Sequence, residues 1–157
     1  MLGKEIIRKE LTRVDIDVKT PIALFECMGK TFLEMGYVND KYVPSIISRE
    51  KEYPTALPVE PYPIAIPHTE ADAIIKPFIA PVRLKETVEW GDMSDLEKTL
   101  NVKLVFLLGF NDPNAHIELL QILIYNFQRP EWVEKLFSAR TDEELYDAVY
   151  SMEWKHE

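Results

Sequence analysis

The sequence predicts an α/β sandwich, because strand-like and helix-like segments alternate along it. Two segments open with a capping residue followed by proline, Thr20-Pro21 and Asp112-Pro113, and this pattern is typical of helix N-termini. The apolar run of residues 102–108 has the length and composition of a buried strand. Together these features indicate a layered core built from both kinds of element.

The first half of the chain predicts two helices and then a stiff loop. Residues 5–17 alternate briefly between apolar and polar side chains, which indicates a strand or an irregular lead-in. One helix is expected from Thr20 to a stop at Gly36, and a second over about residues 40–51. Five prolines within residues 53–67 exclude a helix or a central strand there.

The second half is expected to supply most of the sheet and the remaining helices. After the stiff loop, residues 69–72 have room for one helical turn. The elements expected beyond that turn are strands over 78–84 and 87–90, a polar loop or short helix over 91–101, the strand over 102–108, and helices starting at Asp112, Pro130 and Thr141. Thr141 with Glu144 forms a capping box.

Composition excludes several classes of function. The formal net charge is −9 and no basic run exceeds two residues, which argues against binding to nucleic acid or to anionic membranes. No apolar window is long enough to insert into a bilayer, and we see no signal peptide. The single cysteine, Cys27, is expected to be a small core residue in a reducing compartment. We therefore expect a cytoplasmic protein of one domain over residues 1–157.

Three residues are candidates for chemistry, namely His68, Arg49 and His116. His68 follows Pro67 at the end of a short apolar segment, and strand ends are where α/β folds place reactive groups. Proline restrains the backbone beside the imidazole, which suits a group that must meet a reactant in one geometry. No metal-ligand spacing accompanies His68, so neither a metal nor another cofactor is expected.

The segments around these residues resemble a known family. Residues 49–55, Arg-Glu-Lys-Glu-Tyr-Pro-Thr, and residues 64–68, Ile-Ala-Ile-Pro-His, are similar to the active-site signature of phosphotransferase-system IIA proteins of the fructose–mannitol superfamily. Residues 112–120 resemble the family's second block, and residues 66–70 and 129–131 look closest to the galactitol branch. The sequence departs from the family pattern at Ala56, Pro61 and Thr69, all in loop positions.

The resemblance implies a fold, a reaction and partners. The expected fold is a mixed β-sheet flanked by helices on both faces, the mannitol/fructose IIA-like sandwich. The phosphocarrier protein HPr would donate a phosphoryl group to Nε2 of His68, and a IIB component would accept it, in a pathway for galactitol or a related sugar. His116 matches a second active-site histidine, and Arg49 matches the motif arginine that holds phosphate oxygens. Thr55 and Thr69 are expected to shape the site or contact phosphate.

Other interpretations of the same residues remain open. The domain is also compatible with a regulatory module that senses the phosphorylation state without serving sugar uptake. Arg49 is equally compatible with a surface ion pair, and His116 with an exposed helix-terminal residue. Glu70 and Asp72 would repel a phosphoryl group, so we expect them to point away from it. The apolar residues suggested for docking are Ile64, Ile66 and Tyr62, which are equally plausible core residues.

Overall fold

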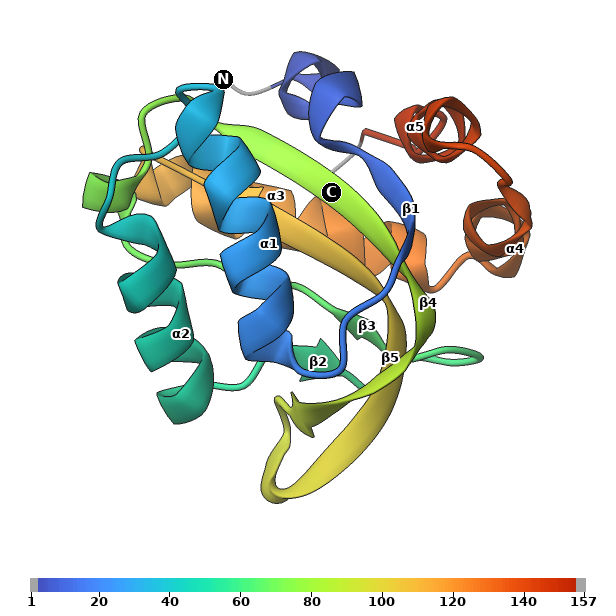
Figure 1. Cartoon of the computed structure of the whole chain (residues 1–157). Coiled ribbons are helices and arrows are strands. Elements are labelled where there is room, and N and C mark those ends of the chain that lie inside the picture. Colours follow the sequence, from blue (N-terminus) through green and yellow to red (C-terminus); the bar gives the residue numbers. More distant parts are fainter. Residues whose placement is uncertain (1–2, 155–157) are drawn as a thin grey trace.

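The computed structural model describes residues 3–154 as a sheet of five strands with helices on both faces (Figure 1). The sheet is mixed. Strand β1 (Arg13–Ile16) runs parallel to β4 (Phe78–Asp92), and β4 runs antiparallel to β5 (Asp95–Gly109). Two short strands complete it, β2 (Ala56–Leu57) and β3 (Ile64–Ala65); β3 lies parallel to β5 through the Ile64–Leu104 and Ala65–Val105 pairs. Both lie between β4 and β5 in the strand order, so the exclusion of a central strand from residues 53–67 is wrong: two-residue strands fit between the prolines. The predicted fold class is confirmed.

Two helices cover one face of the sheet. They are α1 (Pro21–Glu34) and α2 (Tyr42–Glu52), and they enclose the core around Phe25, Phe32 and Trp90. The Thr20 hydroxyl caps α1 by accepting a hydrogen bond from the Ala23 amide. Gly36, at a φ of 80°, then ends this region in the left-handed conformation that glycine adopts without strain.

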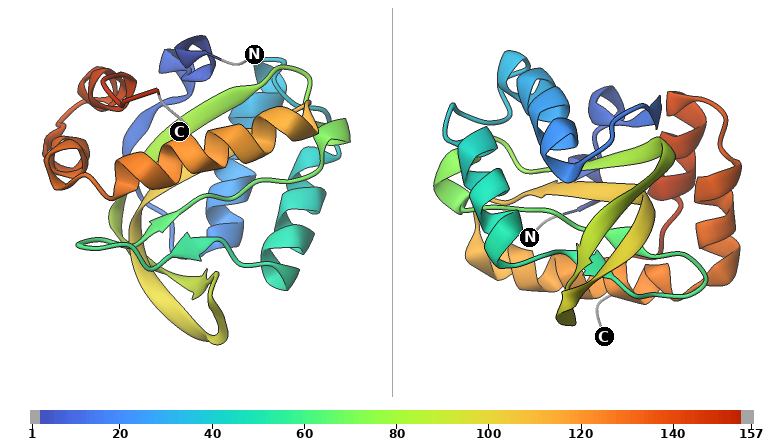
Figure 2. Two further views of the ribbon diagram at one scale, coloured as in Figure 1. Left: turned by 180° about the vertical axis from the view of Figure 1, so that it is seen from behind. Right: turned by 60° about the horizontal axis from the view of Figure 1, so that its bottom comes forward.

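Three helices lie on the other side of the molecule; in the view from behind (Figure 2), the first of them crosses the opposite face of the sheet and the other two lie beside the edge formed by β1. They are α3 (Pro113–Phe127), α4 (Pro130–Ser138) and α5 (Asp142–Tyr150), and they pack on a second core that includes Phe106, Phe127 and Trp132. Asp112 caps α3 and Thr141 caps α5, as predicted. The Glu144 carboxylate, however, accepts a hydrogen bond from the amide of Arg140, the residue before the N-cap, and not from the amide of Thr141 that a capping box predicts.

Three short 3₁₀ turns complete the order of elements: η1 (Lys4–Ile6), η2 (Lys9–Leu11) and η3 (Ala71–Ala73). The first two precede β1, so the lead-in combines irregular turns with a strand, and η3 falls where a single turn was expected. None of the helices within residues 3–154 has both the length and the apolar character needed to cross a membrane.

The prediction of a loop or short helix over residues 91–101 is wrong. These residues form the outer part of a long β-hairpin, in which Trp90 pairs with Leu100 and Gly91 with Thr99. The Asp92 carboxylate closes the turn by accepting from the Ser94 amide and hydroxyl. The polar composition that suggested a loop reflects exposure, because this part of the hairpin extends beyond the helices (Figure 1).

A second correction concerns Cys27, which was expected in the core. It lies on the exposed side of α1, whereas the buried stripe of that helix is formed by Leu24, Phe25, Met28 and Phe32. Helical periodicity therefore decides its position, rather than the general tendency of cysteine to be buried.

Candidate active site

Backbone hydrogen bonds fix both the residue before His68 and the His68 ring. The Pro67 carbonyl accepts a hydrogen bond from the Leu108 amide, which fixes the segment to the end of β5. The His68 Nδ1 atom lies 2.8 Å from the Ile66 carbonyl oxygen. A carbonyl oxygen only accepts, so Nδ1 must carry the proton. This leaves Nε2 as the nitrogen with a free lone pair.

The surroundings of His68 keep its imidazole neutral. The residue is only 8% exposed, and burial lowers the pKa of His68 to about 4, against the opposing effect of the hydrogen bond to Ile66. Charge repulsion from Arg49, and from His116 when it is protonated, lowers the pKa of His68 further. At neutral pH the ring is therefore unprotonated at Nε2 and able to act as a nucleophile.

His116 lies in the first turns of α3 and faces His68. The two ring centroids are 4.6 Å apart, and the planes meet at 71°. On its other side the ring stacks on Phe110 at 4.6 Å. Burial, followed by the charge of Arg49, lowers the pKa of His116. Its Nε2 atom is buried without a hydrogen-bond partner among the described residues, so the ring has unused hydrogen-bonding capacity beside His68.

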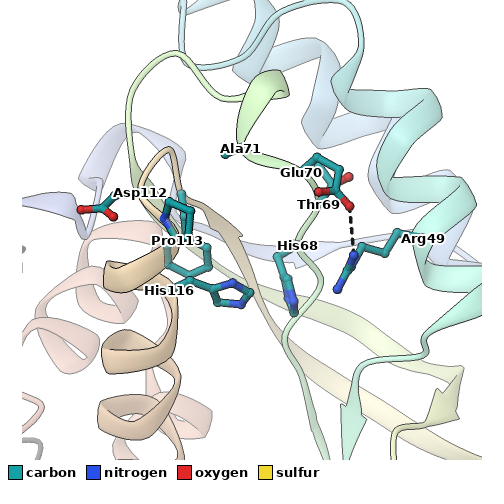
Figure 3. A pocket seen from close by; sticks show the side chains of 9 residues that line it. Arg49, His68, Thr69, Glu70, Ala71, Asp112, Pro113 and His116 are labelled. Carbon is teal, nitrogen blue, oxygen red and sulfur yellow. Dashed lines mark hydrogen bonds and ion pairs between the residues drawn. The ribbon is translucent and has the colours of Figure 1, made fainter.

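Arg49 approaches from the opposite side (Figure 3). It sits in the last turn of α2, its guanidinium lies over the Tyr53 ring at 5.3 Å, and its Nη1 is 3.1 Å from the Glu70 carboxylate. Glu70 was expected to point away from the site. It instead borders the same cavity as His68, while Asp72 pairs with Lys41 outside it.

A cavity of about 150 Å³ joins these groups, lined by His68, His116, Arg49, Thr69, Glu70, Ala71, Phe110, Asp112 and Pro113. Its volume is several times the roughly 30 Å³ that one water occupies in the liquid. A second cavity, of about 280 Å³, opens on the other side of His68 and Arg49. The arrangement therefore combines a neutral nitrogen nucleophile, a fixed cation and space for an anionic group.

The two threonines singled out in the sequence hold the segments that carry the site. The Thr69 hydroxyl is hydrogen-bonded to the Ser45 hydroxyl, so the residue after His68 is attached to α2 one turn before Arg49. Thr55 donates both its amide and its hydroxyl to the Glu50 carboxylate, at 2.8 Å each. The Thr55 side chain is therefore bonded to Glu50 within the turn that follows α2. Thr55 also borders the second cavity.

Sequence reasoning missed Glu50, which lies beside Arg49 in the chain but faces inward. Besides Thr55, it accepts a hydrogen bond from Trp90 Nε1 at 2.9 Å. Burial raises the pKa of Glu50 to about 7, against the opposing effect of these hydrogen bonds. A hydrogen bond from the Ile66 amide to the Thr55 carbonyl then links this cluster to the segment that holds His68. The sequence feature that could have identified Glu50 is its place within the motif of residues 49–55.

The apolar residues suggested for docking lie elsewhere. Ile64 and Ile66 are buried in the core, and the Tyr62 ring packs at a tilt against Phe137, with centroids 4.3 Å apart, beside a different cavity. The exposed apolar side chains that border the second cavity are Tyr53, Met93 and Leu96, the last two from the hairpin tip. Among residues 3–154, no three His, Cys, Asp or Glu side chains are grouped to hold a metal ion.

Comparison with known proteins identifies a family. The model for the family described as "Phosphoenolpyruvate-dependent sugar phosphotransferase system, EIIA 2" matches residues 5–152. The galactitol-specific EIIA component of Escherichia coli K12 is 32% identical over 111 residues, which are 71% of this chain and 73% of that protein.

Solved structures with the same fold come from the mannitol system of Escherichia coli. The mannitol-specific cryptic phosphotransferase enzyme IIA superposes with a TM-score of 0.74 at 18% identity, covering 93% of this chain and 96% of that one. The mannitol enzyme IIA in complex with phosphorylated enzyme IIB superposes with a TM-score of 0.69 at 23% identity, covering 95% and 96%.

Proposed function

The chain belongs to the EIIA type 2 family of the phosphoenolpyruvate-dependent sugar phosphotransferase system, a family of phosphotransferases, and from this premise we propose that His68 is its phosphoryl carrier. The observation that carries the proposal is the hydrogen bond from Nδ1 to the Ile66 carbonyl. It commits the ring to one tautomer and leaves Nε2 as the attacking atom, in a cavity that a phosphoryl group can enter.

The transfer consists of two displacements at phosphorus. In the first, the Nε2 lone pair forms a bond to phosphorus, and the bond to the donor breaks with its electron pair returning to the donor. In the second, the acceptor, which by the family resemblance is a cysteine thiolate of a IIB component, attacks phosphorus, and the P–Nε2 electron pair returns to the His68 ring. Nδ1 keeps its proton throughout, and the Ile66 carbonyl stabilises the positive character of the phosphorylated ring.

Two cavity residues complement the transferred group. The planar, permanently charged guanidinium of Arg49 offers donors to the equatorial oxygens. His116 contributes a hydrogen bond through Nε2, which has no partner among the described residues, so that bond requires no existing contact to be broken. We assign Thr69 and Thr55 a supporting role, because each fixes a segment that carries the site.

The donor and the acceptor follow from the family. We propose that HPr donates the phosphoryl group in the cytoplasm and that a IIB component accepts it, as the mannitol enzyme IIA–IIB complex suggests by similarity of fold. The galactitol-specific relative favours galactitol or a related sugar alcohol for the pathway. The chain itself would contact phosphoryl groups and proteins rather than the sugar.

The test is phosphorylation by phosphoenolpyruvate, the general energy-coupling enzyme and HPr, followed by intact-mass analysis. We expect one acid-labile phosphoryl group on the wild type and none on His68→Ala. His116→Ala should still be labelled but should pass its phosphoryl group to IIB about tenfold more slowly, the loss expected for one hydrogen bond of about 1.4 kcal/mol. An undiminished mass shift in His68→Ala would overturn the assignment.

The same experiment distinguishes transport from regulation. A transport component delivers the phosphoryl group to a galactitol-type IIB protein, whereas a regulatory module would be labelled by HPr yet fail to label any IIB tested. Delivery to IIB is the result that we expect.

A further inference from the structure

The Glu70 carboxylate is paired with Arg49, the residue that is proposed to bind the phosphoryl group. Its Oε1 lies 3.1 Å from Arg49 Nη1, and the residue borders the cavity that contains His68 and His116 (Figure 3). Glu70 is two positions after His68 in the chain. The resting site therefore already contains an anion bound to the cation that is proposed to hold the phosphoryl group.

This ion pair is weak enough for Arg49 to exchange Glu70 for another anion. The Glu70 side chain is 67% exposed and that of Arg49 is 34% exposed, and water screens such pairs strongly. The contact uses one guanidinium nitrogen and not the paired geometry that makes arginine–carboxylate bonds strong. The hydrogen bond between Thr69 and Ser45 anchors the backbone next to Glu70, so a rotation of the exposed side chain is sufficient to release Arg49.

A phosphoryl group on His68 would compete with Glu70 for the guanidinium. The phosphoryl group carries up to two negative charges, whereas the carboxylate carries one, so the guanidinium favours the phosphoryl group. Glu70 must then either turn away or remain as a like charge beside it, and both outcomes disfavour the phosphorylated state. The carboxylate thereby keeps the phosphoryl group easier to pass on.

We propose that Glu70 is an exchangeable counter-ion of Arg49, a positioning residue that occupies the guanidinium in the resting protein and weakens the retention of the phosphoryl group on His68. The inference rests on the proposed function of His68. It predicts that removal of the Glu70 charge makes His68 a better phosphoryl acceptor and a poorer donor.

The chain offers a matched control in Glu52. This residue borders the second cavity, which Arg49 also lines, whereas the ion pair of Arg49 is made with Glu70. Glu70→Gln and Glu52→Gln therefore remove the same charge from the same neighbourhood, and only the first removes the counter-ion. Both positions are at the surface, and a thermal melt of each variant verifies that the fold is unchanged.

The experiment measures the equilibrium between phosphorylated HPr and this chain, reached from both directions and read by intact mass. His68 is first loaded with phosphoramidate, a small phosphoryl donor whose P–N bond breaks as ammonia leaves, so loading does not depend on HPr. For Glu70→Gln we expect a shift of about fivefold toward the phosphorylated chain, or about 1 kcal/mol, that shrinks at high ionic strength. Glu52→Gln should shift the equilibrium less than twofold.

The outcomes separate the two proposals. If neither phosphoramidate nor HPr labels His68 in the wild type, the phosphoryl-carrier function fails, and the role of Glu70 fails with it. If the wild type is labelled and neither variant shifts the equilibrium, the carrier function stands and the role of Glu70 as a counter-ion is overturned. If both variants shift it equally, the effect comes from surface charge in general, which also overturns the counter-ion role.

Discussion

Two adjacent residues at the end of α2, Arg49 and Glu50, lie in opposite environments. Glu50 faces inward and accepts three hydrogen bonds from two residues, Thr55 and Trp90. Arg49 faces the cavity, with one exposed ion pair and one aromatic contact. A buried, multiply bonded carboxylate is costly to disturb, while an exposed pair exchanges readily. The comparison indicates that Glu50 maintains the structure of the site and that Arg49 remains available to ligands.

The largest effect is expected from Glu50→Ala. It would leave the Trp90 indole and the Thr55 amide and hydroxyl without their acceptor, and it would open a cavity beside the sheet. We expect the free energy of unfolding to fall by about 3 kcal/mol, as measured by urea denaturation. Glu52→Ala, just over half a helical turn away on the exposed side, should change it by less than about 0.5 kcal/mol. Equal losses in the two variants would contradict the structural role of Glu50.

Arg49→Ala should slow phosphoryl transfer strongly and change stability little, the reverse of what is expected for Glu50→Ala. The stability of the fold should change by less than about 1 kcal/mol, because the ion pair that it removes is exposed. Phosphorylation of His68 by HPr should slow about 100-fold, since one charged donor to the transferred group is lost. Stopped-flow or quench-flow labelling measures this rate. If Arg49→Ala unfolds the protein and Glu50→Ala only slows transfer, the proposed division of roles is wrong.

The His68 ring provides a third test, through pH. Its pKa is about 4 in the folded protein and close to the usual 6.5 when unfolded, so the unfolded chain binds the proton more tightly. Stability should therefore decrease as pH falls from 6.5 toward 4. Between pH 7 and pH 4.5 the wild type should lose about 2 kcal/mol relative to His68→Asn. Glu50 titrates in both proteins, so its contribution cancels in the difference; a constant difference would refute the buried neutral ring.

The sequence was most informative where the structure is decided locally. The helix caps at Thr20, Asp112 and Thr141 depend on residues within three positions, and all three are present. The outer hairpin could not be recognised in the same way, because the strand character of residues 95–101 comes from pairing with residues across the turn rather than from their own polar composition.

The candidate site was predictable in part. Motif residues indicated His68, Arg49 and His116, and the structure brings all three around one cavity. The bond from Trp90 to Glu50 spans 40 positions, and the direction of Glu70 depends on how η3 packs near α2. Neither follows from local sequence, since the position of each side chain is set by tertiary packing.

The most direct test of the central claim is a nitrogen–phosphorus NMR experiment on His68 before and after phosphorylation by HPr. The hydrogen bond between Nδ1 and the Ile66 carbonyl predicts a neutral ring with its proton on Nδ1 at pH 7, and a phosphoryl group that appears on Nε2 of the same residue. A proton on Nε2 in the resting protein, or a phosphoryl group on Nδ1 or on another residue, would contradict it.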